Sequence, residues 1–169
     1  MIKELRSEEE LIKCVDLLRA AFETVARDFA LTEESAPTNA AFTTLENMKR
    51  HLEKRMTLYG MFSGASLVGC VAIKKSKGSE SVFYIERLAV APEKRHRGHG
   101  EQLLSFAFEQ IRKDGGRTAS IGLMDNNERL KKWYRSKGFV QHDCRDIEHL
   151  PFKVCFMSID LGEGMVRTG

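Results

Sequence analysis

The chain has 169 residues, 42% of them hydrophobic and 30% charged, which is the composition of an ordinary globular protein. This length fits one domain with a buried core, and we expect residues 1–169 to form a single domain. A net charge of +3 is too small to indicate a nucleic-acid partner, and the sequence lacks the long apolar run that a membrane-spanning helix needs.

Apolar periodicity and turn residues divide the chain into helices and strands. In chain order the pattern predicts a strand at 1–5, a helix from 7 to about 29–31, a helix at 45–54, strands at 57–62, 67–74 and 82–90, a helix at 98–113, a strand at 118–124, a helix at 127–136, and strands at 139–145 and 154–161. Ser7 before Glu8-Glu9-Glu10 is typical of a helix start. This order predicts an α/β or α+β protein with a mixed sheet and helices on its faces. The tail at 162–169 is expected to be frayed.

A basic, glycine-rich turn, Arg95-His96-Arg97-Gly98-His99-Gly100, stands between a predicted strand and a predicted helix. This arrangement can bind phosphate, because the glycines admit a close approach and the first helical amides have no partners. Arg95 and Arg97 add positive charge. The turn is not a nucleoside-triphosphate loop, since Glu101-Gln102 follows the second glycine, nor a dinucleotide fingerprint, since Leu103 replaces the third. On these residues alone, a helix start that is basic by chance is the alternative.

The residues that follow make the pattern more specific. Residues 127–134 contain Asn-x-x-Leu-x-x-Trp-Tyr, and Gly138-Phe139 closes the segment. Together with the Arg-x-x-Gly-x-Gly turn, these pieces resemble the GCN5-related N-acetyltransferases (the GNAT family) from about residue 82 to 140. The resemblance implies the acyl-CoA N-acyltransferase fold, with a mixed, mostly antiparallel sheet of about six or seven strands flanked by about four helices. It also implies acetyl-CoA as cosubstrate without a metal, and a cleft between the strands that end at Val90 and start at Thr118.

By this resemblance, the turn would hold the diphosphate of coenzyme A, and the preceding strand would pair with the pantetheine arm. The residues expected to contact the cofactor are Leu88, Ala89, Val90, Arg95, His96, Arg97, Gly98, His99, Gly100, Glu101, Asn127 and Tyr134. Three alternatives stay open. They are ordinary sheet pairing for residues 88–90, a solvated charge for Arg95, and a helix N-cap for Asn127, which is compatible with a cofactor contact.

Two residues are candidates for proton transfer. Tyr134 matches the family tyrosine that protonates the leaving sulfur, and a neutral phenol, which titrates near 10, can donate to a forming thiolate. Glu86 interrupts an apolar strand and is the candidate base, because an alkylammonium is protonated at neutral pH. The alternatives are a core aromatic for Tyr134, and for Glu86 an ion pair with Arg87 or a solvated position, with the proton leaving through ordered water.

The acceptor is expected beside the loop at 29–42, where Phe29, Glu33 and Phe42 would contact it together with Glu86. The loop at 146–152 is expected to form the opposite wall, and acids at the entrance would favour a cationic amine. The alternative for both loops is surface without a ligand. The predicted function is acetyl transfer from acetyl-CoA to a primary amine of a small molecule, by direct attack in a ternary complex. A peptide acceptor, or a non-catalytic sensor of coenzyme A or acyl-CoA, is the alternative.

Other features limit the remaining partners. Cys14, Cys70, Cys144 and Cys155 form no Cys-x-x-Cys pair, so we expect no zinc site and reduced core thiols at positions 14, 70 and 155. The N-terminus has no apolar signal region, so a cytoplasmic location is expected. Lys74, Lys75 and Lys77 are interpreted as a solvated hairpin tip rather than a binding site. We expect no nucleic-acid or membrane partner, while an edge strand near the C-terminus leaves a homodimer open.

Overall fold

The computed structural model describes residues 1–162. Its elements are β1 (Ile2–Glu4), α1 (Glu8–Asp28), η1 (Ala40–Phe42), α2 (Leu45–Glu53), β2 (Met56–Ser63), β3 (Ser66–Lys75), β4 (Val82–Val90), η2 (Pro92–Lys94), α3 (His99–Lys113), β5 (Thr118–Met124), α4 (Glu128–Ser136), β6 (Val140–Asp146) and β7 (Lys153–Asp160). Every predicted helix and strand is present, and their ends differ by a few residues at most. The predicted fraying concerns residues 162–169, of which only Gly162 lies within the described part of the chain.

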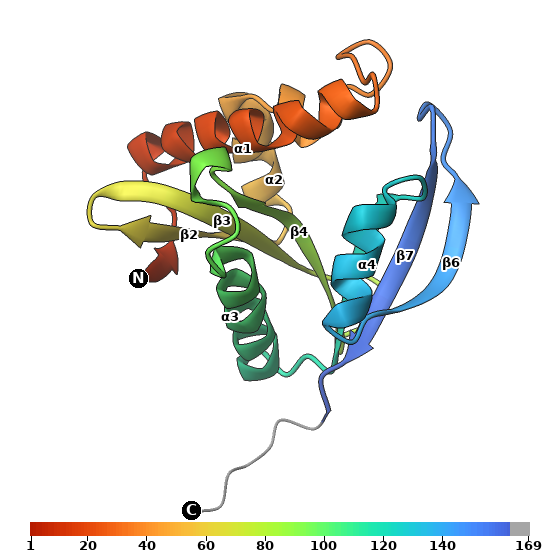
Figure 1. Ribbon diagram of the computed structural model, residues 1–169. Helices are drawn as coiled ribbons and strands as arrows, with labels where there is room; N and C mark the ends of the chain where they lie inside the picture. Colours follow the sequence, from red (N-terminus) through yellow and green to blue (C-terminus); the bar gives the residue numbers. More distant parts are fainter. Residues whose placement is uncertain (163–169) are drawn as a thin grey trace, which may run out of the picture.

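The strands form one mixed sheet in the order β1-β2-β3-β4-β5-β7-β6 (Figure 1). All neighbouring strands are antiparallel except β4 and β5, which are parallel and are joined through α3 as a crossover helix. The last strand, β7, lies between β5 and β6, so β6 forms the edge. The predicted fold class is confirmed, with seven strands in a mostly antiparallel sheet and four α-helices.

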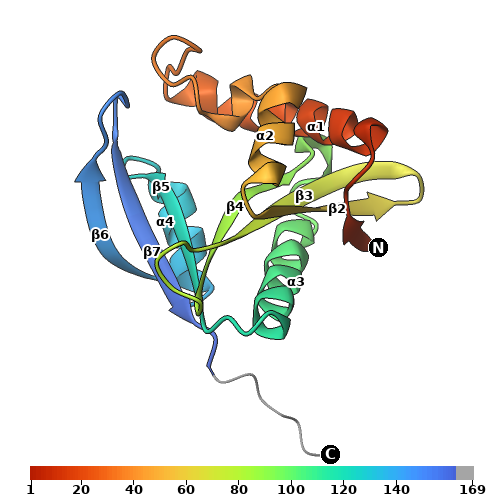
Figure 2. The same ribbon diagram turned by 180° about the vertical axis from the view of Figure 1, so that it is seen from behind.

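The strands β4 and β5 separate soon after they begin. Their pairing covers only Val82–Tyr84 and Thr118–Ser120, so residues 85–90 of β4 have no strand partner on that side. Both views show the two halves of the sheet opening like a V between these strands (Figure 1 and Figure 2). The opening implied by the family resemblance is therefore present. It leaves free main-chain groups along β4 with which an extended ligand can pair.

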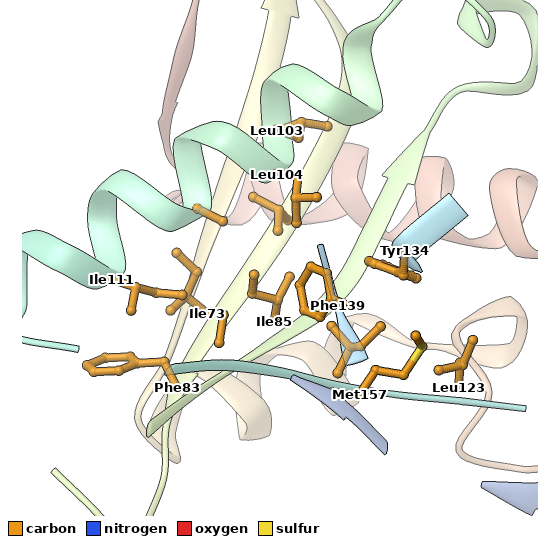
Figure 3. Close-up of a cluster of buried hydrophobic side chains, with 14 of the residues drawn as sticks. Ile73, Phe83, Ile85, Leu103, Leu104, Ile111, Leu123, Tyr134, Phe139 and Met157 are labelled. Carbon is orange, nitrogen blue, oxygen red and sulfur yellow. The ribbon is translucent and has the colours of Figure 1, made fainter. Parts of the chain in front are cut away.

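The helices cover opposite faces of the sheet. On one face, Leu104 of α3 and Ile85 of β4 belong to a core that also contains Tyr134 of α4 (Figure 3). On the other face, Leu18 of α1 and Met48 of α2 belong to a second core. Within residues 1–162, no helix combines the length and the apolar character that crossing a lipid bilayer requires.

A capping box determines where α1 begins. Ser7 accepts a hydrogen bond from the Glu10 amide at 3.2 Å, and the Glu10 carboxylate accepts from the amides of Arg6 and Ser7 at 2.9 and 3.1 Å. Lys3 donates to the same carboxylate at 2.6 Å. The hydrogen bond from Lys3, followed by the two amides, lowers the pKa of Glu10 to about 2. These contacts fix the start of α1, and its C-terminal half then lies over the opening in the sheet.

Candidate active site

The first amides of α3 are free. Gly98 precedes the helix with a left-handed φ of 81° and provides no side-chain cap. The amide of Gln102 donates to the carbonyl oxygen of Gly98 at 3.0 Å, which closes the first helical turn. Within residues 1–162, the amides of residues 97–101 donate to no acceptor. These amides and the positive end of the helix dipole form a site for an anion.

The two glycines of this turn meet different requirements. A Cβ at Gly98 would enter open space, but the residue would have to keep its left-handed conformation, which glycine adopts without steric cost. A Cβ at Gly100 would lie 3.7 Å from Trp133 and 3.9 Å from Val90, which are ordinary contacts. Glycine at position 100 therefore leaves more room between α3 and α4 than any other residue would.

A cavity of about 1460 Å³ extends from this turn into the opening between β4 and β5. Among the expected cofactor residues, those that line it are Leu88, Ala89, Val90, Arg95, His96, Gly98, His99, Gly100, Glu101, Asn127 and Tyr134. Arg97 is not among the lining residues. The structure thus brings all but one of the expected cofactor side chains to a single cavity.

Arg95 has a partner that the sequence did not indicate. Its Nη2 donates to the carbonyl oxygen of Ala21 in α1 at 2.7 Å, which ties the turn to that helix. The other guanidinium nitrogens bond nothing within residues 1–162, and the residue lines the cavity. His99, the first residue of α3, lines the same cavity, and its Nδ1 is buried without a partner. Arg95 can therefore position the turn and contact an anion at the same time.

A bulge in β4 lies beside the cavity. The register of β3 and β4 shifts between Cys70 and Ala72, opposite Arg87. Arg87 has a left-handed φ of 52°, and the thiol of Cys70 donates to its carbonyl oxygen at 3.4 Å. A bulge re-aims the groups of its strand, and here it does so where β4 has lost its β5 partner.

Asn127 caps α4, as one of the two interpretations predicts. Its Oδ1 accepts a hydrogen bond from the amide of Leu130 at 3.2 Å, and the residue also lines the cavity. Its side-chain nitrogen has no partner within residues 1–162. The cap therefore leaves one polar group available for a ligand.

Tyr134 lies where the core meets the cavity. Its ring packs edge-on against those of Trp133 and Phe139, with centroids 4.9 and 5.2 Å apart. Figure 3 shows the ring beside Phe139 at one end of the core. Burial raises the pKa of the phenol above its ordinary value, so the hydroxyl stays protonated. That hydroxyl bonds nothing in the described part of the chain, and Tyr134 lines the cavity.

Glu86 lies on the face of the sheet that α1 and α2 cover. It is directly opposite Ala72, which belongs to the core of that face. Its Oε2 is 3.6 Å from Nη1 of Arg87, and its side chain is 36% exposed. Because Glu86 also lines the cavity, the structure is compatible with both the ion pair and the base.

The acceptor side agrees only in part with the sequence-based expectation. Phe29 lines the cavity, whereas Glu33 and Phe42 are not among its lining residues. Phe42 instead packs against an apolar cluster that Phe152 of the late loop also contacts. The loops at 29–42 and 146–152 therefore meet at a shared cluster, and the late loop contributes no cavity-lining residue.

The sequence did not reveal the walls that the C-terminal half of α1 and the strands of the second half of the sheet contribute. The strand residues include Ser120 and Gly122 of β5, His142 and Arg145 of β6, and Phe156 of β7. The two small residues of β5 alternate with buried apolar ones, and this alternation could have predicted that they share one face of the strand. The other three depend on β7 lying between β5 and β6, which local patterns do not encode.

Lys74 also belongs to the cavity. The interpretation of Lys74, Lys75 and Lys77 as one solvated tip is wrong for Lys74, which lies opposite Tyr84 and lines the cavity. Lys75 pairs with Glu80 at 2.7 Å, and Lys77 is exposed in the turn. The alternation of side chains along β3 separates these neighbours.

A cluster of two cysteines and one aspartate joins β6, β7 and the residue that follows β5. As expected, the thiols of Cys14, Cys70 and Cys155 are buried and free. Cys144 and Cys155 face each other across β6 and β7 with sulfurs 2.7 Å apart, and Asp125 completes a group whose ligand atoms lie within 4.8 Å. The Lys131 ammonium bonds the Asp125 carboxylate, and burial raises the pKa of the Cys155 thiol to about 12.

Solved structures share this architecture. The PaiA N-acetyltransferase of Thermoplasma acidophilum, determined with coenzyme A, matches at a TM-score of 0.73 and 18% identity over 92% of this chain and 98% of that one. The ribosomal-protein-S18-alanine N-acetyltransferase of Escherichia coli matches at 0.73 and 14% identity over 95% and 93%. An N-acetyltransferase of Staphylococcus aureus matches at 0.70 and 16% identity over 95% and 98%. The fold is therefore the acyl-CoA N-acyltransferase fold.

The sequence comparison identifies the family. The family model described as Acetyltransferase (GNAT) family matches residues 15–139, which is more than half of the chain. None of the curated proteins matches the chain significantly. The chain belongs to the GNAT family of acetyltransferases, as its motifs indicated.

Proposed function

We propose that the chain transfers an acetyl group from acetyl-CoA to the primary amine of a small molecule. The observation that carries this proposal is the row of free amides at residues 97–101, at one end of the cavity between β4 and β5. A helix start binds many anions, so it does not by itself specify the ligand. Membership of the GNAT family, and the coenzyme A in the PaiA structure, favour coenzyme A.

The residues present fit that cofactor. The amides of residues 97–101 suit a diphosphate, with Arg95 beside them. The unpaired edge of β4 at residues 85–90 suits the amides of a pantetheine arm, in the manner of an added strand. The free side-chain nitrogen of Asn127 can bond the same arm from α4. When bound, acetyl-CoA supplies the acetyl group as a thioester.

Tyr134 is the proposed proton donor. Its hydroxyl is protonated at neutral pH, because a phenol titrates near 10 and burial raises the pKa of Tyr134 further, and it has no other partner within residues 1–162. A thiol titrates near 8.5, well below such a phenol, so Tyr134 stabilises a departing thiolate chiefly by donating a hydrogen bond. The T-shaped contacts of its ring hold the hydroxyl in place for this role.

Glu86 is the proposed group that receives the amine proton. It lines the same cavity as Tyr134, so the cofactor and the acceptor can be held together, and this supports direct attack in a ternary complex. Its pairing with Arg87 at 3.6 Å is loose, which leaves the carboxylate able to bond an ammonium group. The proton reaches Glu86 directly or through one ordered water.

The packing of the loops favours a compact acceptor over a peptide. Phe42 and Phe152, from the two loops on the acceptor side, pack against one apolar cluster. A peptide that approached between these two loops would have to displace this packing, whereas a small amine would not. The S18-alanine N-acetyltransferase shares the fold, so a peptide acceptor is the alternative to be tested beside small amines.

The test measures release of free coenzyme A thiol from acetyl-CoA in the presence of single amines and of short peptides with a free N-terminus. Thiol release with a small amine, accompanied by the mass of the acetylated amine, is expected. Binding of coenzyme A in calorimetry without release with any acceptor would reject the transferase proposal and favour a sensor. Release with peptides only would reject the small-molecule acceptor.

A further inference from the structure

Two cations on the acceptor side have no role in the proposed transfer. Lys74 of β3 lines the cavity, and its ammonium forms no ion pair or hydrogen bond within residues 1–162. It lies opposite Tyr84, and Ala72, two residues earlier on the same face, lies opposite Glu86. Lys74 and Glu86 are therefore diagonal neighbours on one face of the sheet, a spacing of about 7–8 Å between their backbones.

Arg87 is incompletely satisfied. Its side chain is only 12% exposed, and its Nε is buried without a partner. Its one ion pair within the described residues joins Nη1 to Glu86 at 3.6 Å, longer than an ordinary hydrogen bond. Buried guanidinium groups are normally fully bonded, because leaving such donors unpaired costs free energy. The terminal nitrogens that remain unbonded belong to a residue that lines the cavity.

The two cations, Lys74 and Arg87, both lie close to His51 of α2. The pKa of His51 in α2 lies below its ordinary value, first because of burial and then because Arg87 and Lys74 are close. Arg145, another cation of the cavity wall, is bonded to Asp143 and stacks on Phe156 at 5.1 Å, so it is already engaged. Four acids line the cavity, Asp28, Glu86, Glu101 and Glu128. Glu101 pairs with Lys137 and Glu128 with Lys131, while Glu86 faces Arg87. Lys74 and Arg87 thus form a positive subsite beside the proposed base.

We propose that the acceptor amine also carries a carboxylate or phosphate group, and that Lys74 and Arg87 bind this anion while the amine lies at Glu86. The proposal rests on the transferase function proposed above. Arg87 offers a planar donor group suited to an oxyanion, and Lys74 adds a point charge. The diagonal spacing from Glu86 fits a molecule whose amine and anion are a few bonds apart. The sequence-based expectation was an acidic entrance that favours a cationic amine, and this subsite adds an anionic group to that amine.

The experiment compares matched acceptors. One arm pairs an α-amino acid with the amine that remains after decarboxylation, and the other pairs an amino sugar with its phosphate ester. Thiol release gives kcat/KM for each, and calorimetry on the coenzyme A complex gives the affinity of each acceptor independently of turnover. The anionic member of at least one pair is expected to be preferred by about 10-fold to 100-fold, the range for a hydrogen bond to a charged group. A preference in the amino-acid arm identifies a carboxylate, and a preference in the amino-sugar arm identifies a phosphate.

Two variants connect the preference to the subsite. Lys74→Met should remove most of it, mainly by raising KM for the charged acceptors, and should lower kcat/KM for the uncharged acceptors much less, because the Lys74 ammonium has no structural partner within residues 1–162. Lys77→Met, an exposed neighbour in the turn, is the matched control and should behave as wild type. Arg87→Gln should act as Lys74→Met does if its melting temperature is unchanged. If Arg87→Gln does not fold, Lys74→Met and its control decide alone.

Each outcome assigns the failure. Equal kcat/KM for charged and uncharged members, or a preference that Lys74→Met retains, overturns the anion subsite and leaves the transferase intact. If none of the amines causes thiol release, the transferase function is rejected. In that case selective binding of the anionic members to the coenzyme A complex would still support the subsite, and absence of binding would overturn it.

Discussion

The amide of Gln102 donates to the carbonyl oxygen of Gly98 across 3.0 Å, and the amides between these residues donate to nothing within residues 1–162. Gly98→Glu tests whether these amides bind the diphosphate of coenzyme A. The new carboxylate would stand at the anion site and would strain a backbone with φ of 81°. We expect calorimetry to detect no binding of coenzyme A.

A matched control separates strain from charge at the site. Gly115, just beyond the C-terminal end of α3, has φ of 83° and equally open surroundings. Gly115→Glu should reduce stability to a similar extent and leave the affinity for coenzyme A unchanged. Equal affinities in wild type and Gly98→Glu would remove the glycine turn from cofactor binding.

Tyr134→Phe tests the proton donor. The hydroxyl bonds nothing within residues 1–162, so the ring contacts and the melting temperature should survive its loss. Turnover should fall by about 10²-fold or more, the usual effect of removing one hydrogen-bond donor to a developing anion, while the affinity for coenzyme A stays nearly intact. Tyr59→Phe, whose ring packs on Phe106 outside the cavity, is the control and should keep full turnover. Undiminished turnover in Tyr134→Phe would exclude this residue from the mechanism.

Glu86→Gln tests the base. Without a base, the rate depends on the fraction of amine that is already neutral, which falls about tenfold for each pH unit below its pKa. The deficit relative to wild type should therefore be largest at low pH, with an overall loss of about 10²–10⁴-fold. Asp28→Asn removes another acid of the cavity wall and should not reproduce this profile. A rate that is unaffected by Glu86→Gln across the pH range would assign the base elsewhere.

Glu10→Gln tests the electrostatic contribution at the start of α1. The folded pKa of Glu10 is about 2, below the value near 4.3 of an unfolded chain. The charged carboxylate therefore stabilises the fold above about pH 4.3, and this stability is lost as the pH falls towards 2.

At pH 7 we expect Glu10→Gln to lower the melting temperature by about 2–4 °C, as a loss of about 1 kcal/mol does in a domain of this size. The difference from wild type should shrink between about pH 4 and pH 2. Glu9→Gln, at an exposed position of the same turn, should have a smaller effect. A difference that is constant with pH would contradict the assigned role of the carboxylate.

Local sequence patterns predicted the elements and the phosphate turn because both are encoded by neighbouring residues. Gly98 adopts its left-handed conformation without steric cost, and Ser7 and Asn127 cap the helices that they precede. The motif predicted Tyr134, and an acid within an apolar strand predicted Glu86; both line one cavity, and their catalytic roles stay predictions.

Contacts between distant segments could not be predicted in this way. Arg95 was expected at a phosphate, but its bond to the carbonyl of Ala21 depends on how α1 lies over the turn. Lys74 was grouped with its neighbours in sequence, but the alternation of β3 turns it toward the cavity. Cys144 and Cys155 meet only because β7 pairs with β6 in one particular register. Each of these contacts depends on tertiary packing rather than on local propensity.

The most direct measurement is the crystal structure of the chain with coenzyme A. The diphosphate oxygens should lie within hydrogen-bond distance of the main-chain nitrogens of residues 97–101, with the pantetheine arm along β4 and the sulfur near the Tyr134 hydroxyl. A diphosphate bound elsewhere, or no bound molecule at saturating coenzyme A, would contradict the account.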